Sequence, residues 1–337
     1  MDPRRARLDA LAGRLRSQRV VVAGDVIADE FIYGQIARVS REAPVLILSY
    51  DSTEIVPGGA GNAAANVAAL GGAVRIVGLA GRDEPGRRLV AVLKRGRTDT
   101  RALIQPPGYW TPTKTRILAG GIHSAKQQVV RIDRASNGPV TDVVRERFRS
   151  RVLAAVRGCD ALLVSDYGSG LVTPSLVNEA RTRMAAGAVV LVDSRYSLLR
   201  YRRMTACTPN ESEVEQALDV RIGDDPRVLE RAGRTLLRQT RASGVLVTRG
   251  SRGMALFQPD VPTVHIPISG SDQVTDVTGA GDTVIATMTL ALAAGASLED
   301  AARLANYAGG VVVMKRGTAT VSRAELQRAI ASDPAWA

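Results

Sequence analysis

The stretch Ala161-Leu162-Leu163-Val164-Ser165-Asp166 decides the fold, because it is a short apolar run that ends in polar residues. A run of this kind is typical of a strand that is buried on both faces of a parallel sheet. Similar runs occupy residues 20–24, 74–79, 188–193 and 245–248, with helical stretches between them. This alternation predicts an α/β fold in which helices flank a mostly parallel central sheet.

Polar side chains stand at the ends of several of these runs. Asp25, Asp166, Asp193 and Thr248 each follow or close an apolar run. The carboxyl ends of parallel strands meet at one edge of a sheet, where open α/β sheets bind their ligands. The sequence therefore predicts a ligand site at this edge.

Two regions break the alternation of strand and helix. Residues 30–50 and 109–133 contain short stretches of alternating polarity, such as Thr113-Lys114-Thr115-Arg116-Ile117-Leu118. A period of two is typical of strands with one exposed face. We expect a small antiparallel sheet that projects from the main body as a lid. Because no repeat and no Pro/Ser-rich linker divides the chain, residues 1–337 are expected to form one domain.

The composition is that of an ordinary folded protein. The 337 residues are 45% hydrophobic and 23% charged. No uncharged apolar stretch has the roughly 18 residues that a membrane span needs, and the start of the chain lacks the apolar core of a signal peptide. We therefore expect a cytoplasmic protein without a membrane partner.

The distribution of charge and the small number of cysteines and histidines argue against a nucleic-acid-binding protein, a zinc protein and a Cys-His enzyme. A net charge of +12 suits an anionic partner, but the arginines are scattered with little aromatic interleaving. This argues against nucleic acid and leaves a nucleotide or sugar phosphate as the anion. The isolated Cys159 and Cys207, with His123 and His265, lack the spacing of a zinc site or a Cys-His catalytic pair. We interpret both cysteines as buried packing residues.

The strongest chemical signal is Asp276-Val277-Thr278-Gly279-Ala280-Gly281-Asp282, which precedes a helical run. Gly279, Ala280 and Gly281 allow a tight turn that leaves the first helical amides free to hold a phosphoryl group. Asp282 then lies beside this anion hole, where it can accept a proton from an attacking hydroxyl. The alternative is a plain helix start in which the carboxylates only favour the helix dipole.

A second glycine-rich motif is Pro57-Gly58-Gly59-Ala60-Gly61-Asn62, which leads into an alanine-rich helix. Adjacent glycines let a ligand approach the backbone, and Asn62 and Asn66 project amides from the first turns. The alternative is a turn whose small residues serve only packing. Taken alone, the motif supports the two interpretations equally.

Together these motifs resemble a known family. Gly58-Gly59 with Asn62, Asn210 with Glu213, and the block from Asp276 to Asp282 resemble, in order and spacing over nearly the whole chain, the ribokinase-like (PfkB) carbohydrate kinases. Gly24-Asp25, Thr113-Lys114, and residues 38–45 and 127–133 look more closely like the D-glycero-β-D-manno-heptose 7-phosphate kinases, including the kinase half of bifunctional heptose enzymes. Because the chain ends at Ala337, we expect no nucleotidyltransferase half.

The resemblance implies a fold with a β-lid that also forms a homodimer contact, a sugar between lid and sheet edge, and ATP against the C-terminal half. Asp282 is then the catalytic base, with Gly279, Ala280 and Gly281 as the anion hole. The implied sugar-binding residues are Asp25, Gly58, Gly59 and Asn62. The implied nucleotide-binding residues are Asn210, Glu213, Thr248, Gly250, Gly253 and Asn306.

The resemblance also implies metal ions. Asn210 and Glu213 would order the water shell of Mg²⁺ near the phosphates, in keeping with the oxygen ligands that Mg²⁺ prefers. Asp276 and the Thr278 carbonyl offer a site for a monovalent cation such as K⁺, a feature that varies within the family. The residues themselves leave another interpretation for Asn210 and Glu213, because they also match a capping box at a helix start.

Lys114 and Arg131 are the candidates for binding the 7-phosphate of the substrate. The alternative is that they, with Arg116, form the charged face of an exposed lid strand, and for Arg116 we favour that alternative. The heptose kinases tend to read Asp-Tyr-x-Lys-Gly and Asp-Pro-Lys where this chain has residues 166–170 and Asp193-Ser194-Arg195, so two lysines are absent and Arg195 keeps one charge.

The sequence is therefore interpreted as that of an ATP-dependent kinase of the anomeric hydroxyl of D-glycero-β-D-manno-heptose 7-phosphate. The alternative enzyme is another kinase of the family that acts on a hexose phosphate, ribose or a nucleoside. The alternative from another class is a catalytically idle sugar- or nucleotide-binding protein, against which the intact Asp282 and anion hole argue.

Overall fold

A computed structural model describes residues 2–120, 126–138, 140–270 and 275–333 of the chain, so His123 lies outside the described residues. Its main sheet has the strand order β12-β11-β10-β9-β8-β7-β1-β4, in which the pairs from β4 to β10 are parallel and β11 and β12 are antiparallel. The strands are β1 (Arg19–Gly24), β4 (Ala73–Val77), β7 (Ala161–Asp166), β8 (Val189–Ser194), β9 (Ala206–Cys207), β10 (Gly244–Thr248), β11 (Met254–Phe257) and β12 (Val264–Ile266). The predicted mostly parallel sheet is confirmed.

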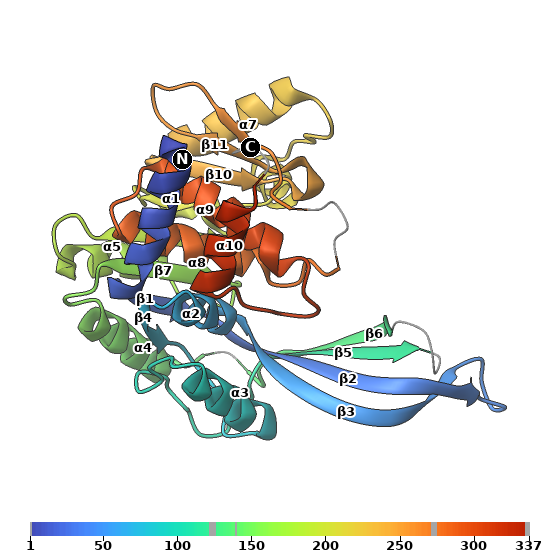
Figure 1. Ribbon diagram of the computed structural model, residues 1–337. Helices are drawn as coiled ribbons and strands as arrows, with labels where there is room; N and C mark the ends of the chain where they lie inside the picture. The colour runs from blue at the N-terminus through green and yellow to red at the C-terminus, as the bar shows by residue number, and fades with distance from the viewer. Residues whose placement is uncertain (1, 121–125, 139, 271–274, 334–337) are drawn as a thin grey trace.

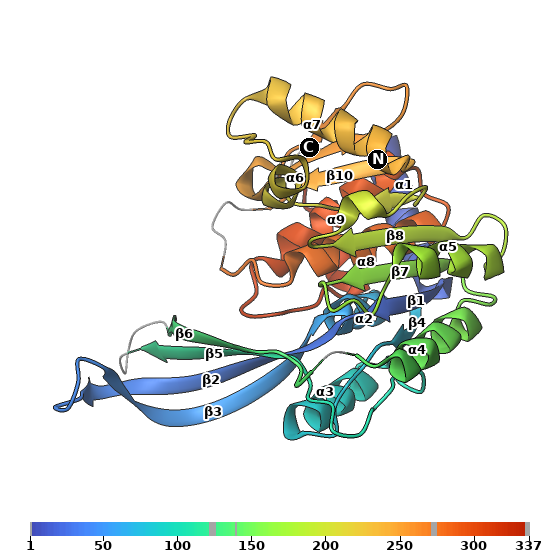
Figure 2. The same cartoon turned by 180° about the vertical axis from the view of Figure 1, so that it is seen from behind.

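Helices cover both faces of this sheet (Figures 1 and 2). Successive side chains of a strand point to opposite faces, so Val20 and Val22 of β1 enter one core whereas Val21 and Ala23 enter the other. Both faces are therefore apolar, as the uninterrupted hydrophobic runs predicted. Cys159 and Cys207 are buried in the second core, which confirms their packing role. The helices are α1 (Pro3–Arg14), α2 (Ala60–Ala69), α3 (Glu84–Arg95), α4 (Asp142–Ala155), α5 (Pro174–Arg183), α6 (Glu211–Leu218), α7 (Pro226–Thr240), α8 (Ala280–Ala293), α9 (Leu298–Val312) and α10 (Arg323–Ala331).

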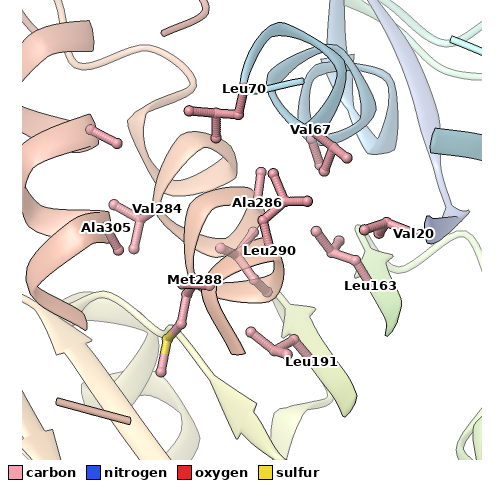
Figure 3. Close-up of a cluster of buried hydrophobic side chains, with 14 of the residues drawn as sticks. Val20, Val67, Leu70, Leu163, Leu191, Val284, Ala286, Met288, Leu290 and Ala305 are labelled. Carbon is pink, nitrogen blue, oxygen red and sulfur yellow. The ribbon is translucent and has the colours of Figure 1, made fainter. Parts of the chain in front are cut away.

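Helix α8 carries the candidate base and is held by the first core. Its residues Val284, Met288 and Leu290 pack against α2, α9 and the strands β7 and β8 (Figure 3). Nearly every side chain of α8 is buried, so its N-terminus is held firmly at the sheet edge. None of the helices in the described part of the chain combines the length and the apolar character that a membrane span requires.

Four further strands form the lid, which projects from the main body (Figure 1). They are β2 (Val26–Val39), β3 (Leu46–Gly59), β5 (Thr113–Gly120) and β6 (Gln127–Arg134), in the order β3-β2-β5-β6. The β2–β3 and β5–β6 pairs are antiparallel as expected, whereas β2 and β5 are parallel. The parallel pair arises because both strands leave the main body at the same end and run outward side by side. The expected division into one domain stays a prediction.

Candidate active site

Acidic side chains gather at the carboxyl ends of β1, β7 and β8. Asp25 follows β1 directly, Asp166 ends β7, and Asp193 is the second-to-last residue of β8. Burial raises the pKa of Asp193 well above its usual value, and the negative charges of Glu213 and Asp282 raise it further. The expected edge of the sheet is therefore the place where these acids meet.

The turn before α8 has the geometry that the glycine motif predicted. Gly279 has a φ of +77°, a left-handed conformation that glycine adopts without a steric penalty. The amide of Ala280 donates to the Val277 carbonyl at 3.2 Å. In the described part of the chain, the amides of Gly281 and Asp282 donate no hydrogen bond, so they are available to an anion at the helix N-terminus.

Asp282 occupies the first turn of α8, and only 5% of its surface is exposed. Burial raises the pKa of its carboxyl group to about 7. A hydrogen bond from Asn62 lowers this pKa, the negative charge of Asp29 raises it, and Lys114 and Tyr167 lower it. A carboxyl group with a pKa near the working pH is well suited to take up a proton from a substrate hydroxyl.

The glycine motif after β3 packs against the site. Nδ2 of Asn62 donates to Oδ2 of Asp282 at 2.8 Å and to the carbonyl of Gly279 at 3.3 Å. A Cβ at Gly58 would lie 2.6 Å from Oδ2 of Asp29, and one at Gly59 would lie 2.6 Å from the carbonyl of Asp25. Gly58 and Gly59 thus allow close packing of backbone and carboxylates, while Asn62 contacts the candidate base directly.

Asp25 and Asp29 have different surroundings. The carboxylate of Asp25 accepts hydrogen bonds from the Tyr167 amide at 2.7 Å, from the Ser169 amide at 3.4 Å, and from the Ser169 hydroxyl. Burial raises the pKa of Asp25. Asp29 lies on β2 at the base of the lid and acts electrostatically on Asp282. Asp25 therefore orders the loop after β7, whereas Asp29 is close enough to the candidate base, Asp282, for its charge to affect the pKa of that residue.

The basic side chains of the lid base do not share one environment. Lys114 of β5 lies over the Tyr167 ring at 5.2 Å, and burial lowers its pKa. Arg116 is buried in an ion pair with Asp29 at 2.7 Å, with exposed side-chain fractions of 12% and 8%. Arg131 of β6 is exposed and pairs with Asp133 at 3.0 Å. The interpretation of Arg116 as a solvated charge is wrong, because β2 and β5 pair in parallel and bring Arg116 within reach of Asp29.

Asn210 and Glu213 form the capping box that the sequence offered as an alternative. The Asn210 amide donates to Oε2 of Glu213 at 3.0 Å, and the Glu213 amide donates to Oδ1 of Asn210 at 2.9 Å. Oε1 of Glu213 lies 4.0 Å from the guanidinium of Arg195. The cap uses one carboxylate oxygen of Glu213, and the second faces Arg195 and the charge of Asp193.

The other candidate nucleotide-binding residues lie in two separate places, one at the end of β10 with the turn that follows it and one on helix α9. Thr248 ends β10 and bridges to Asn210, and the turn that follows contains Gly250 and Gly253 with φ of +57° and +75°. Asn306 lies on α9 and donates to the Pro267 carbonyl at 2.9 Å. The contacts join Thr248 to Asn210, whereas Asn306 contacts the segment after β12.

The candidate cation residues are held by backbone amides. Oδ1 of Asp276 accepts the Thr278 amide at 2.9 Å, and Oδ2 accepts the Gly317 amide at 3.0 Å. The loop before α8 is thereby joined to the segment before α10. This contact shapes the turn that presents Asp282.

Three residues near Asp282 were not selected as site residues from the sequence: Asp29, Tyr167 and Asp193. Asp29 is an acid within the apolar run that follows Asp25, a pattern that signals a buried, functional carboxylate. The sequence marks Asp193 only as the end of an apolar run. Tyr167 matches the tyrosine of the Asp-Tyr-x-Lys-Gly pattern, but its approach to Asp282 depends on the loop after β7.

A parallel sheet with a projecting lid, and an acid in the first turn of a helix that begins on a glycine turn, are features of the ribokinase-like fold. The chain belongs to the pfkB family of carbohydrate kinases, whose pattern matches residues 18–325.

Relatives and solved structures agree with this assignment. The bifunctional protein HldE of Trichlorobacter lovleyi is 39% identical over 97% of this chain and 65% of its own length. The HldE protein of Gluconobacter oxydans is 40% identical over 93% of this chain and 64% of its own length. The chain thus spans less than two thirds of these relatives.

Two solved structures show the fold. Phosphofructokinase-2 from Escherichia coli in complex with potassium has a TM-score of 0.75 at 20% identity, covering 94% of this chain and 98% of its own. The ribokinase of Arabidopsis thaliana complexed with ribose and ATP has a TM-score of 0.70 at 20% identity, covering 93% and 99%.

Proposed function

We propose that the protein transfers the γ-phosphoryl group of ATP to the anomeric hydroxyl of D-glycero-β-D-manno-heptose 7-phosphate, which yields the 1,7-bisphosphate. The resemblance of the lid and strand-end motifs to heptose 7-phosphate kinases, and the similarity to HldE proteins, support this substrate. The observation that carries the reaction is Asp282, a buried carboxyl group with a pKa of about 7 beside unpaired helix amides.

The chemistry follows from this juxtaposition. Asp282 takes the proton of the sugar hydroxyl as the oxygen attacks phosphorus, and the bond to the β-phosphate oxygen breaks. The amides at the Gly279-Ala280-Gly281 turn and the positive end of α8 stabilise the charge on the moving phosphoryl group. Phosphoryl transfer needs mainly positioning and charge stabilisation, which this site supplies.

We assign the sugar to the space between the lid base and Asp282. Asn62 and Asp29 then contact sugar hydroxyls, because both lie next to the base. Gly58 and Gly59 let the backbone approach the sugar. Asp25 contributes through the loop that it orders after β7, and its carboxylate remains a candidate for a sugar hydroxyl.

The phosphate remote from the reacting hydroxyl is assigned to Lys114. Its ammonium group is half-buried, and the nearby positive charge of Arg195 further lowers its pKa, as expected where two cations share a small space. An anion placed between the two would relieve this repulsion. Arg131 lies on β6, the strand that pairs with β5, and is the third basic residue assigned to this phosphate.

The nucleotide is assigned to the C-terminal half. We assign it to Thr248, Gly250 and Gly253 at and after the end of β10, and to Asn306 on α9. Asn210 and Glu213 fit a role toward hydrated Mg²⁺, because Glu213 keeps an oxygen beyond its cap and Asp193 adds a second acid. Bound Mg²⁺ would offset the charge of the phosphates. Asp276 and Thr278 remain the proposed site for K⁺.

We also propose that the protein is a homodimer through the lid. Many apolar side chains of the lid are exposed, namely Ile36, Val39, Val45, Leu46, Tyr50, Val129, Val130 and Ile132. A four-stranded sheet with so many exposed apolar residues has little core of its own. A second lid would cover them.

The test is ATP consumption by the purified protein across a panel of sugars and sugar phosphates. We expect the highest kcat/KM with the heptose 7-phosphate, and a ³¹P NMR spectrum of the product with a new anomeric phosphate. Preference for a hexose phosphate, ribose or a nucleoside would assign the protein to another activity of the family. Absence of ATP consumption with every sugar would refute the proposal.

A further inference from the structure

Asn66 is a buried side chain of α2 that does not touch the substrate space. It has 0% exposure and lies one helical turn after Asn62. Its Oδ1 accepts the backbone amide of Val321 at 3.4 Å and the hydroxyl of Thr283 at 3.1 Å. Because a backbone N–H can only donate, the oxygen of Asn66 must face Val321, and its NH₂ group must face the other way.

That NH₂ group meets Asn62. Nδ2 of Asn66 donates to the carbonyl and to Oδ1 of Asn62, each at 3.1 Å. The oxygen of the Asn62 amide is therefore engaged on this side. Its NH₂ group must point to Asp282 and the Gly279 carbonyl, which are both acceptors. Space is also tight here, since a Cβ at Gly279 would lie 2.5 Å from Nδ2 of Asn62.

We propose that Asn66 is a positioning residue for the catalytic base: it fixes which end of the Asn62 amide faces Asp282. The inverted amide would place an oxygen against the carboxylate and repel it. The inference rests on the proposed role of Asp282 as the base. It links the backbone of the C-terminal segment at Val321 to the base through two asparagines.

The link from Asn66 through Asn62 to Asp282, called the relay below, is one of several influences on the pKa of Asp282, which other groups around it also affect. Those groups are Asp29 on β2, Lys114 on β5, Tyr167 after β7 and Asp193 on β8. The hydrogen bond from Asn62 lowers the pKa of Asp282. Loss of one hydrogen bond to a charged group shifts a pKa by about one unit or more. A disordered Asn62 amide should therefore raise the pKa of Asp282.

The experiment compares Asn66→Ala with Asn62→Ala and with the double variant. In each single variant, the acid limb of the plot of kcat/KM against pH should shift to higher pH by about one unit. At pH values below the limb, kcat/KM should be roughly tenfold lower than in the wild type. The KM for ATP should not change. The double variant should shift no further than Asn62→Ala, because Asn66 acts only through Asn62.

A second measurement does not use activity. In protein labelled with ¹³C at the aspartate carboxyl groups, the signal that is absent from Asp282→Asn should titrate near pH 7 in the wild type and higher in Asn66→Ala. Thr289→Ala is the matched control, since Thr289 is equally buried on α8 and, among the described residues, its hydroxyl donates only to the Ile285 carbonyl. Should Asn66→Ala fail to fold, Asn66→Asp keeps the shape and lacks the NH₂ donor.

The outcomes separate the two proposals. An unshifted titration in Asn66→Ala, or a shift that persists in full when Asn62 is already alanine, overturns the relay. A shift of the same size in Thr289→Ala also overturns it, because a general loosening of α8 would then be the cause. Full turnover in Asp282→Asn overturns the base assignment instead, while the titration still reports on the relay.

Discussion

Replacement of Asp282 by asparagine is the sharpest perturbation of the proposed mechanism. The substitution keeps the shape of the side chain and removes its ability to accept a proton. Loss of a general base lowers turnover by roughly 10²–10⁴-fold. Because the amides of the glycine turn remain, the affinity for ATP should stay close to that of the wild type.

The pH dependence adds a second, independent magnitude. The raised pKa of Asp282, about 7, predicts that kcat/KM of the wild type rises with pH up to this value. At one unit below the pKa, about a tenth of the molecules carry the ionised base. Steady-state assays with a coupled ADP readout between pH 5.5 and 8.5 should show this limb, and Asp282→Asn should lack it.

Asp300→Asn is the matched control. Asp300 occupies the same position in the first turn of α9, is buried to a similar degree at 6% exposure, and pairs with Arg7 away from the site. This variant should retain wild-type turnover with an unchanged limb. If Asp282→Asn kept near-normal turnover, or if Asp300→Asn lost as much, the assignment of Asp282 as the base would be refuted.

Four further predictions follow from the same geometry. Lys114→Ala should lower kcat/KM for the phosphorylated sugar by about one to two orders of magnitude, since a charge-assisted contact contributes roughly 1.5–3 kcal/mol, and should leave kcat/KM for the free sugar unaffected. An equal loss of kcat/KM on both sugars would exclude a phosphate site at Lys114. The control is Lys126→Ala, which replaces a lid lysine that pairs with Asp51. Ile132→Lys should shift sedimentation from dimer toward monomer, and a monomeric wild type at micromolar concentration would contradict the lid contact. The folded protein binds the Asp282 proton more tightly than the unfolded chain does, so the wild type loses stability as pH rises from 3.8 to about 7. In thermal melts over this range, the Tm of Asp282→Asn should therefore rise relative to that of the wild type. A Tm difference that does not change with pH would contradict the raised pKa. Addition of K⁺ at constant ionic strength should raise kcat in the wild type and not in Asp276→Ala, and equal responses would remove Asp276 from the cation site.

The sequence alone determined the main sheet and the position of the candidate base, Asp282. Apolar runs such as residues 161–166 bury both faces of a strand, and this property depends only on neighbouring residues. The turn Gly279-Ala280-Gly281 likewise carries its conformation locally, because only glycine adopts the positive φ without strain. Such features can be predicted from a short window of sequence.

The pairing of the lid strands determined their relative direction and register, which the sequence did not show. The alternating stretches predicted lid strands, but they did not show that β2 and β5 run in parallel. That register brings Arg116 to Asp29 and places Lys114 beside Tyr167. Strand direction and register depend on which segments meet in space, so the ion pair of Arg116 had no local signal.

Tertiary structure alone assembled the surroundings of Asp282. Asn62 lies 220 positions away from it in the chain, and Asn66 lies 255 positions from Val321. The pKa of Asp282 is raised mainly by burial, which arises only when α8 packs against α2 and the sheet. The sequence determined which groups can do the chemistry, whereas packing determined their protonation and orientation, because both depend on distances between segments that are remote in the chain.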